Sequence, residues 1–113
     1  MSTNRIIATI KDMTDFNDLF MNNIPNKEET QTRTEKLQDI RNCLIKQNVT
    51  RVEYEEQVSR LTELLDTFVE LNRQNSHLQE KFPNYDRKYD KFIIQMKHVI
   101  LTVKVQIILL DLS

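Results

Sequence analysis

The sequence predicts an all-α protein built of elongated helices. Three observations lead to this prediction: apolar residues recur at spacings of three and four, glycine is absent, and only two prolines interrupt the 113 residues. Such spacing is typical of amphipathic helices, and the two prolines are the strongest helix breakers in the chain. We therefore expect a coiled coil or helical hairpin with a break near Pro25 and a corner near Pro83.

Residues 1–24 form the first predicted segment, an N-terminal amphipathic helix. Its apolar positions follow helical spacing and face away from its polar residues. These positions are Ile6, Ile10, Met13, Phe16 or Asn17, and Phe20. The stretch Asn22 to Asn26 should end the helix, because asparagine tolerates turn geometry and Pro25 cannot continue a helix.

Residues 25–82 form the second predicted segment, a long coiled-coil helix. Asn26 resembles an N-cap for its first part. The following stretch, Lys27 to Glu35, is polar all round, so we expect it to be exposed or frayed.

A kink is possible at residues 47–50 of this segment. Thr50 and Glu53 have the spacing of a capping box, which marks a helix start. Two interpretations stay open: the chain stops near Gln47 and forms an antiparallel hairpin, or it continues as one rod. Because neither glycine nor proline enforces a turn there, we favour continuity or a slight kink.

An apolar stripe along the second half of this segment predicts a coiled-coil seam. Its members alternate three and four residues apart. They are Leu61, Leu64, Phe68, Leu71, Asn75, Leu78 and Phe82. A single amide in such a seam, here Asn75, fixes partner and register at a cost in stability.

Residues 83–113 form the third predicted segment, an apolar C-terminal helix. From Val99 to Leu112 it is apolar nearly all round, so another surface should cover it. The alternation within residues 101–109 also fits a strand, but no partner strand is visible and we favour a helix. This run is too short, and Lys104 too central, for a membrane span of about 20 residues.

The stripe that contains Asn75 can face the final helix of the same chain, in a hairpin around Pro83. This interpretation is compatible with our prediction that both apolar stripes also contact helices of other chains. Two antiparallel helices leave one side of each stripe uncovered, and large apolar surfaces are rarely left to water. The predicted partner-helix interface comprises Leu61, Leu64, Phe68, Leu71, Asn75, Leu78, Phe82, Phe92, Met96, Val99, Val103, Ile107 and Leu110.

The composition argues against catalysis and against several classes of ligand. A chain without glycine has no Gly-rich phosphate loop and no dinucleotide fingerprint. His77, His98 and Cys43 are too few for a zinc site, so we expect no metal, cofactor or small-molecule substrate. The net charge of −1 and dispersed basic residues do not favour nucleic acid.

The same features bear on localisation. A lone cysteine suits a reducing compartment. The first 20 residues do not have the pattern of a signal peptide or anchor. We expect a cytoplasmic protein, with association to the cytoskeleton or a nuclear location left open, and no insertion into a membrane.

Several short patterns resemble a known family. They are Leu37-Gln38-x-Ile40, Ile45, Gln47 and Val52-Glu53, with Asn17-x-Leu19 upstream and Phe82 followed by Tyr85-Asp86. Together they resemble the C-terminal half of the small coiled-coil subunit of the dynactin shoulder, the dynactin subunit 3 family, over residues 17–90. The apolar tail from Val99 to Leu112 has no counterpart in that pattern. The resemblance implies an all-helical structural subunit of the dynein-activating complex with no activity of its own.

The expected function is therefore that of a non-enzymatic structural subunit in a hetero-oligomeric coiled-coil complex, of the kind found in microtubule-motor, kinetochore or vesicle-transport machinery. The alternative is a self-contained small helical bundle that acts as a peptide-binding or regulatory adaptor. A membrane-surface module is a third interpretation, against which the scarcity of basic residues around the apolar tail argues.

Overall fold

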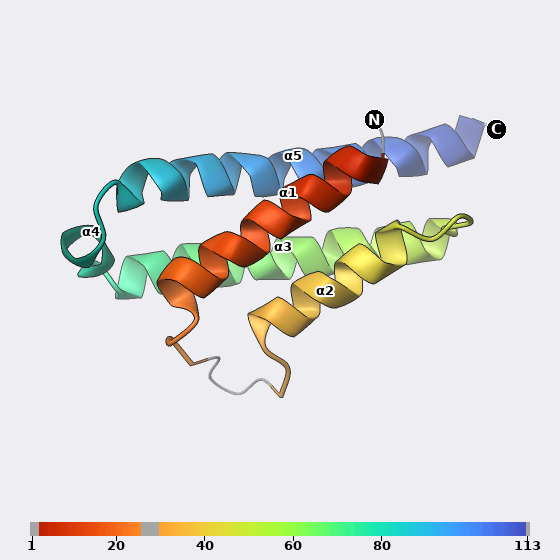
Figure 1. The fold of residues 1–113 in the computed structure, drawn as a ribbon. Helices are drawn as coiled ribbons and strands as arrows, with labels where there is room; N and C mark the ends of the chain where they lie inside the picture. Colours follow the sequence, from red (N-terminus) through yellow and green to blue (C-terminus); the bar gives the residue numbers. More distant parts are fainter. Residues whose placement is uncertain (1–2, 26–29, 113) are drawn as a thin grey trace.

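The fold is a pair of long antiparallel helices with two shorter helices packed across one side of the pair (Figure 1). The computed structural model describes residues 3–25 and 30–112. The elements are α1 (Thr3–Phe16), the π-helical turn η1 (Asn17–Met21), α2 (Arg33–Leu44), α3 (Arg51–Gln74), α4 (Leu78–Lys81) and α5 (Tyr85–Leu112). No strand occurs in the described residues, and the all-α prediction is confirmed.

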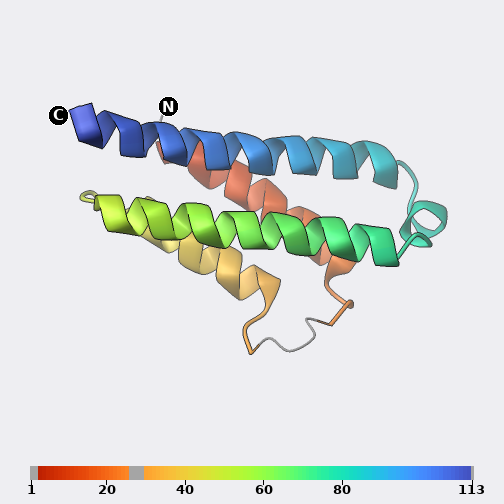
Figure 2. The same cartoon turned by 180° about the vertical axis from the view of Figure 1, so that it is seen from behind.

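The helices form two layers. α3 and α5 lie side by side in one layer and α1 and α2 make the other, so Figure 2 looks directly onto α3 and α5. The molecule measures 50 × 29 × 19 Å along its principal axes, which is a flat bundle rather than an extended rod. In the part of the chain that the structure describes, no helix covers the other side of the α3–α5 pair (Figure 2).

The first helix lies where the sequence places it. α1 and η1 form one continuous helical stretch that ends before Asn22, and Pro25 follows in an irregular loop. Its apolar side chains are buried against the other helices, including Ile10 and Met13. The break near Pro25 is confirmed.

α2 is shorter than predicted. It begins at Arg33 because Thr32 is its N-cap, whose side chain accepts a hydrogen bond from the Glu35 amide. The predicted cap at Asn26 and the start of the polar stretch lie outside the described residues. α2 ends at Leu44.

The favoured continuity at residues 47–50 is wrong. The chain reverses between α2 and α3, which pack as an antiparallel hairpin. The capping box decides the outcome: Thr50 accepts from the Glu53 amide at 3.2 Å, and Glu53 accepts from the Thr50 amide at 3.1 Å. Satisfying both amides starts a new helix without glycine or proline.

Glu53 should make this helix start sensitive to acid. Its contact with Lys46, followed by the bond from the Thr50 amide, lowers the pKa of the Glu53 carboxyl from 4.5 to about 2. A carboxyl whose pKa is lower in the folded state stabilises the fold above its ordinary pKa, and this stabilisation is lost as the pH falls towards about 2. Glu53→Gln should therefore lower Tm near neutral pH and have a progressively smaller effect below pH 4.5.

Thermal unfolding at a series of pH values, followed by circular dichroism, tests this expectation. Glu63→Gln is the matched control, since Glu63 is an exposed glutamate in the middle of the same helix. A constant difference in Tm between wild type and Glu53→Gln across the acid range would show that Glu53 does not supply this pH dependence.

α3 ends at Gln74, eight residues before the predicted end at Phe82. Asn75 is its C-cap, and the Asn75 side chain donates to the Leu71 carbonyl at 2.8 Å. Short amide side chains compete with the helix for backbone groups in this way. Asn75 is thus a helix terminator, and its predicted role as the polar member of a seam is wrong.

The corner near Pro83 is confirmed, and α4 is part of it. Asn84, directly after Pro83, has a φ of 61°, a left-handed conformation that asparagine adopts more readily than most residues. Its carbonyl accepts from the Lys88 amide, and α5 begins at Tyr85. Residues 101–109 lie within this helix, so the strand alternative is wrong.

Aromatic side chains close this end of the bundle. Phe20 packs edge-on against Phe82 and Tyr85, with ring centroids 5.0 and 5.4 Å apart, and Phe16 stacks on Phe92 at 4.2 Å. The Tyr85 hydroxyl donates to the Asn72 side chain at 2.7 Å. Burial raises the pKa of Tyr85. These contacts join α1, η1, α3 and α5 at the corner.

Candidate functional site

Most of the residues predicted to contact a partner helix lie in the core of this chain. Nine of them are at most 9% exposed: Leu61, Leu64, Phe68, Leu71, Leu78, Phe92, Met96, Val99 and Val103. They fill the space between α3 and α5 and beneath α1 and α2. The prediction that these nine form a surface for another chain is corrected: the α3 and α5 stripes cover each other.

The remaining four predicted residues have different environments. Phe82 is half-buried in the aromatic corner and Asn75 caps α3. Ile107 is half-buried, and Leu110 is 40% exposed. The last turn of α5 extends past the start of α1 (Figures 1 and 2), so the inner side of α5 is less covered at this end.

A second apolar stripe runs along the outer side of α5. We call it the outer stripe, and its aliphatic members are Ile94, Leu101, Val105, Ile108 and Leu112. Their side chains are 58, 60, 42, 56 and 78% exposed, respectively. At 100° per residue these positions lie on the side of the helix opposite the buried Met96 and Val103. α5 is therefore apolar on two opposite sides.

The outer stripe is regular and narrow. With His98 included, its members are spaced four, three, four, three and four residues apart, which is a heptad pattern. Lys97 and Lys104 flank it on the side of α3, and Gln95, Thr102 and Leu109 flank it on the other side, where Leu109 is 52% exposed. A narrow apolar stripe whose borders are polar apart from Leu109 is close to the pattern of a coiled-coil seam.

The outer stripe covers only the later part of α5. In the first turns the equivalent outer positions carry Arg87 and Asp90, both exposed, as in an ordinary amphipathic helix. At the far end Asp111 forms an ion pair with Arg51 of α3. This ion pair joins the end of α5 to the start of α3, so the stripe is presented on a helix held at its end.

α5 also meets the length and composition of a membrane-spanning helix. Tyr85–Leu112 has 28 residues, and 22% of its most apolar 18-residue window is buried. The apolar run from Val99 to Leu112 is too short to span a bilayer, but the whole of α5 is long enough. Spanning a bilayer with α5 would require removing α1 and α3 from its inner side, which would expose buried side chains such as Phe68 and Met96.

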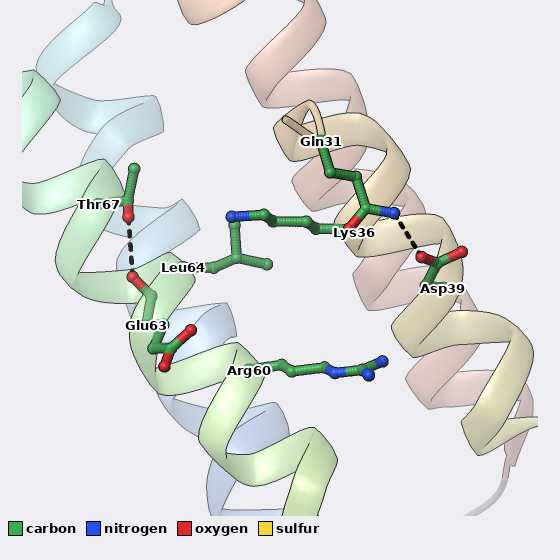
Figure 3. Close-up of a pocket in the computed structure, with 7 residues that line it drawn as sticks. All are labelled: Gln31, Lys36, Asp39, Arg60, Glu63, Leu64 and Thr67. Atoms are coloured by element: carbon green, nitrogen blue, oxygen red, sulfur yellow. Dashed lines mark hydrogen bonds between the residues drawn. The ribbon is translucent and has the colours of Figure 1, made fainter. Parts of the chain in front are cut away.

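A small polar pocket of about 200 Å³ lies between α2 and α3 (Figure 3). Lys36 and Asp39 enter it from α2, and Arg60 and Glu63 enter from α3. Two cations and two carboxylates offset each other, so the pocket has no strong preference for an ion of either sign. Its lining contains no histidine or cysteine for catalysis or metal binding.

The one cysteine of the chain, Cys43, is held in a structural contact. The Cys43 thiol lies 3.7 Å from a Glu53 oxygen, and burial followed by this neighbouring carboxylate raises the pKa of Cys43. A raised pKa reduces the thiolate that a nucleophilic cysteine needs. No cluster of three or more potential metal ligands occurs among the described residues.

The outer stripe was missed because one helix carries two overlapping patterns. The apolar positions that face α1 and α3 begin in the aromatic corner and extend over a longer part of α5 than the outer stripe does. They therefore account for most apolar residues of α5. The signal for the second pattern is present in the sequence as the heptad spacing from Ile94 to Leu112. Separating the two requires assigning every apolar position of α5 to one side of the helix.

Comparisons of this chain with protein-family models, with curated proteins and with solved structures gave no match. The resemblance to the dynactin shoulder subunit stays a prediction. Any statement about function therefore depends on the geometry of the outer stripe.

Proposed function

We propose that this protein is a non-catalytic structural subunit of a helical protein complex, and that the outer stripe of α5 binds a helix of another subunit. One observation carries the proposal. Five aliphatic side chains that are 42 to 78% exposed follow coiled-coil spacing on a helix whose opposite side is already buried. Such a surface is complementary to an apolar stripe on a second helix.

The energetics favour a covered stripe. Fully burying an aliphatic side chain contributes about 1.5–3 kcal/mol. Contiguous apolar patches of several hundred Å² are unusual on soluble monomers and typically mark binding sites. Leaving the outer stripe in water would forgo this stabilisation along about five turns of helix, about 27 Å from Ile94 to Leu112.

The rest of the fold serves to hold this helix. α3 and α1 cover the inner side of α5, and the exposed Arg51–Asp111 ion pair adds a contact between its far end and α3. A helix that is already formed loses little conformational freedom on binding. The bundle thus presents the outer stripe as a preformed surface.

The complex we propose is a cytoplasmic assembly of coiled-coil subunits. The resemblance to the dynactin subunit is the reason for proposing motor-associated machinery. A self-contained adaptor bundle is the second candidate. The buried apolar core between the two layers favours the adaptor bundle, because a chain with such a core can fold without a partner. Both candidates use the same surface and differ in whether the bound helix belongs to a permanent subunit or to a short peptide.

Affinity purification of the intact tagged chain from its own cells tests the proposal. Wild type should retain a stoichiometric helical companion, which includes an untagged copy of the chain itself, and Leu101→Glu should lose it. Val52→Glu is the matched control, because Val52 is an exposed aliphatic residue of α3 (71%) outside the outer stripe. A companion that Leu101→Glu retains as well as Val52→Glu does would contradict the assignment of the site.

A further inference from the structure

We infer that the helix bound by the outer stripe is the outer stripe of a second copy, in antiparallel orientation. This inference rests on the proposed function and names the subunit concerned. The two copies are related by a two-fold axis that passes near the level of Val103 of α5. Three features of the stripe support it: its self-complementary layers, the charges along its border, and its size.

The stripe is complementary to itself when one copy is reversed. In antiparallel coiled coils each layer joins two positions of different heptad type. About the axis near Val103, Leu101 meets Val105 of the second copy and Ile94 meets Leu112 of the second copy. His98 meets Ile108 of the second copy. All six positions of the stripe are used, and none is left without an opposite side chain.

The border charges agree with this orientation. A two-fold antiparallel pair brings the same border of both helices together, so the border facing α3 meets its counterpart. Lys97 of one copy then lies opposite Asp111 of the other, twice in the dimer. Since Asp111 already contacts Arg51, the dimer would contain a cluster of two cations around each Asp111 carboxylate.

The parallel arrangement lacks these features. It would place His98 against His98 in one layer and Lys97 near Thr102, with no opposite charge along the border. The antiparallel arrangement has one unfavourable contact, between the two Lys104 side chains near the axis. Both Lys104 residues are exposed, and their long side chains can direct the ammonium groups into water.

The size of the stripe predicts a weak, reversible dimer. Two such stripes bury on the order of 1,000 Å² in total, at the lower limit of specific interfaces. We expect dissociation in roughly the micromolar range. A membrane surface is less suitable as the occupant, because helices that lie on membranes have a wide apolar side, whereas four of the five residues that border this stripe are polar: Lys97, Lys104, Gln95 and Thr102, with Leu109 the exception.

Sedimentation equilibrium of the purified full chain over a range of concentrations tests the inference. Wild type should reach the mass of a dimer, and Leu101→Glu should weaken association on the order of a hundredfold, because two carboxylates would enter the central layers. Val52→Glu, which introduces the same charge outside the stripe, should leave association unchanged. Circular dichroism should show that both variants keep the wild-type helix content.

Two further variants test the layers and the orientation. His98→Leu should strengthen association about tenfold by replacing the polar member of the seam. Lys97→Asp should weaken the dimer, and adding Asp111→Lys in the same chain should restore it only if residues 97 and 111 of different copies face each other. In a Cys43→Ser background, mixing Ile94→Cys with Leu112→Cys should give an oxidised heterodimer, whereas neither variant alone should cross-link.

The possible failures are distinguishable from failure of the proposed function. A wild-type monomer at all concentrations overturns the dimer, and the proposed function then stands if Leu101→Glu still loses a different helical companion in cells. Cross-linking of Ile94→Cys with itself overturns the antiparallel orientation. Binding of wild type to phosphatidylcholine–phosphatidylserine vesicles that Leu101→Glu abolishes, without dimer formation, overturns both in favour of a membrane surface.

Discussion

Phe68→Ala should destabilise the isolated chain by about 3–5 kcal/mol, the range for truncating a buried phenylalanine. Phe68 is 0% exposed and lies in the centre of the interface between α3 and α5. Its ring packs edge-on against Phe92, with centroids 4.7 Å apart, and the Arg33 guanidinium lies 6.0 Å from its centroid. A cavity at this place removes contacts with more than one helix at once, so the surroundings cannot easily collapse to fill it.

Urea unfolding of the purified chain measures this loss, and Val69→Ala is the matched control. Val69 is the next residue of α3 and is 44% exposed, so its truncation should cost well under 1 kcal/mol. The comparison separates two interpretations of the α3 stripe. If the α3 stripe were covered only by another chain, Phe68→Ala would not change the stability of the isolated chain. Equal urea midpoints for Phe68→Ala and Val69→Ala would contradict the assignment of Phe68 to the core.

The fold class and the main turning points could be predicted from the sequence because they depend on local patterns. The breaks near Pro25 and Pro83 follow from residues that cannot continue a helix. The capping box at Thr50 and Glu53 was also visible in the sequence, and it proved stronger than the absence of turn residues around it. A capping box is thus sufficient to predict the hairpin between α2 and α3, even where the sequence has no glycine or proline at the turn.

The partners of each apolar stripe could not be predicted in the same way. A stripe shows that a helix side is covered but not whether the cover comes from the same chain or from another. Asn75 illustrates the difficulty, because its spacing fits the seam while its side chain bonds the Leu71 carbonyl and ends α3. Once α3 turns back at that point, α5 becomes its neighbour, and the regular apolar stripe left for a partner among the described residues is the outer stripe of α5.

The burial of Arg33 in the core could likewise not be predicted from the sequence, since charged side chains are rarely fully buried. It is 3% exposed at the start of α2. Its guanidinium donates to the Asn17 side chain at 2.7 Å, to the Met21 carbonyl, and to the Ile24 carbonyl at 2.9 Å. These carbonyls belong to the end of the η1 turn and the loop after it, where a positive charge is favourable, and the Met21 carbonyl also accepts from the Ile24 amide at 3.0 Å.

Arg33→Met should therefore destabilise the chain by about 2–4 kcal/mol, because methionine keeps much of the apolar stem while the Asn17 side-chain oxygen and the Ile24 carbonyl lose the guanidinium that donates to them. Arg33→Lys should recover only part of this loss, since an ammonium group cannot reproduce the planar fork that reaches both carbonyls. Arg87→Met is the control on the exposed side of α5, and its effect should stay within about 0.5 kcal/mol.

Amide hydrogen exchange locates the effect of Arg33→Met as well as its size. Protection should fall most in η1 and the last turn of α1, whereas amides in the middle of α3 should change only as much as global stability requires. Uniform loss of protection would show that Arg33 acts only through global packing. An unfolding midpoint equal to that of Arg87→Met would show that the buried guanidinium does not hold the end of the first helix against the start of α2. The orientation of the layer formed by α1 and α2 would then depend on apolar contacts such as those of Met13 and Leu37.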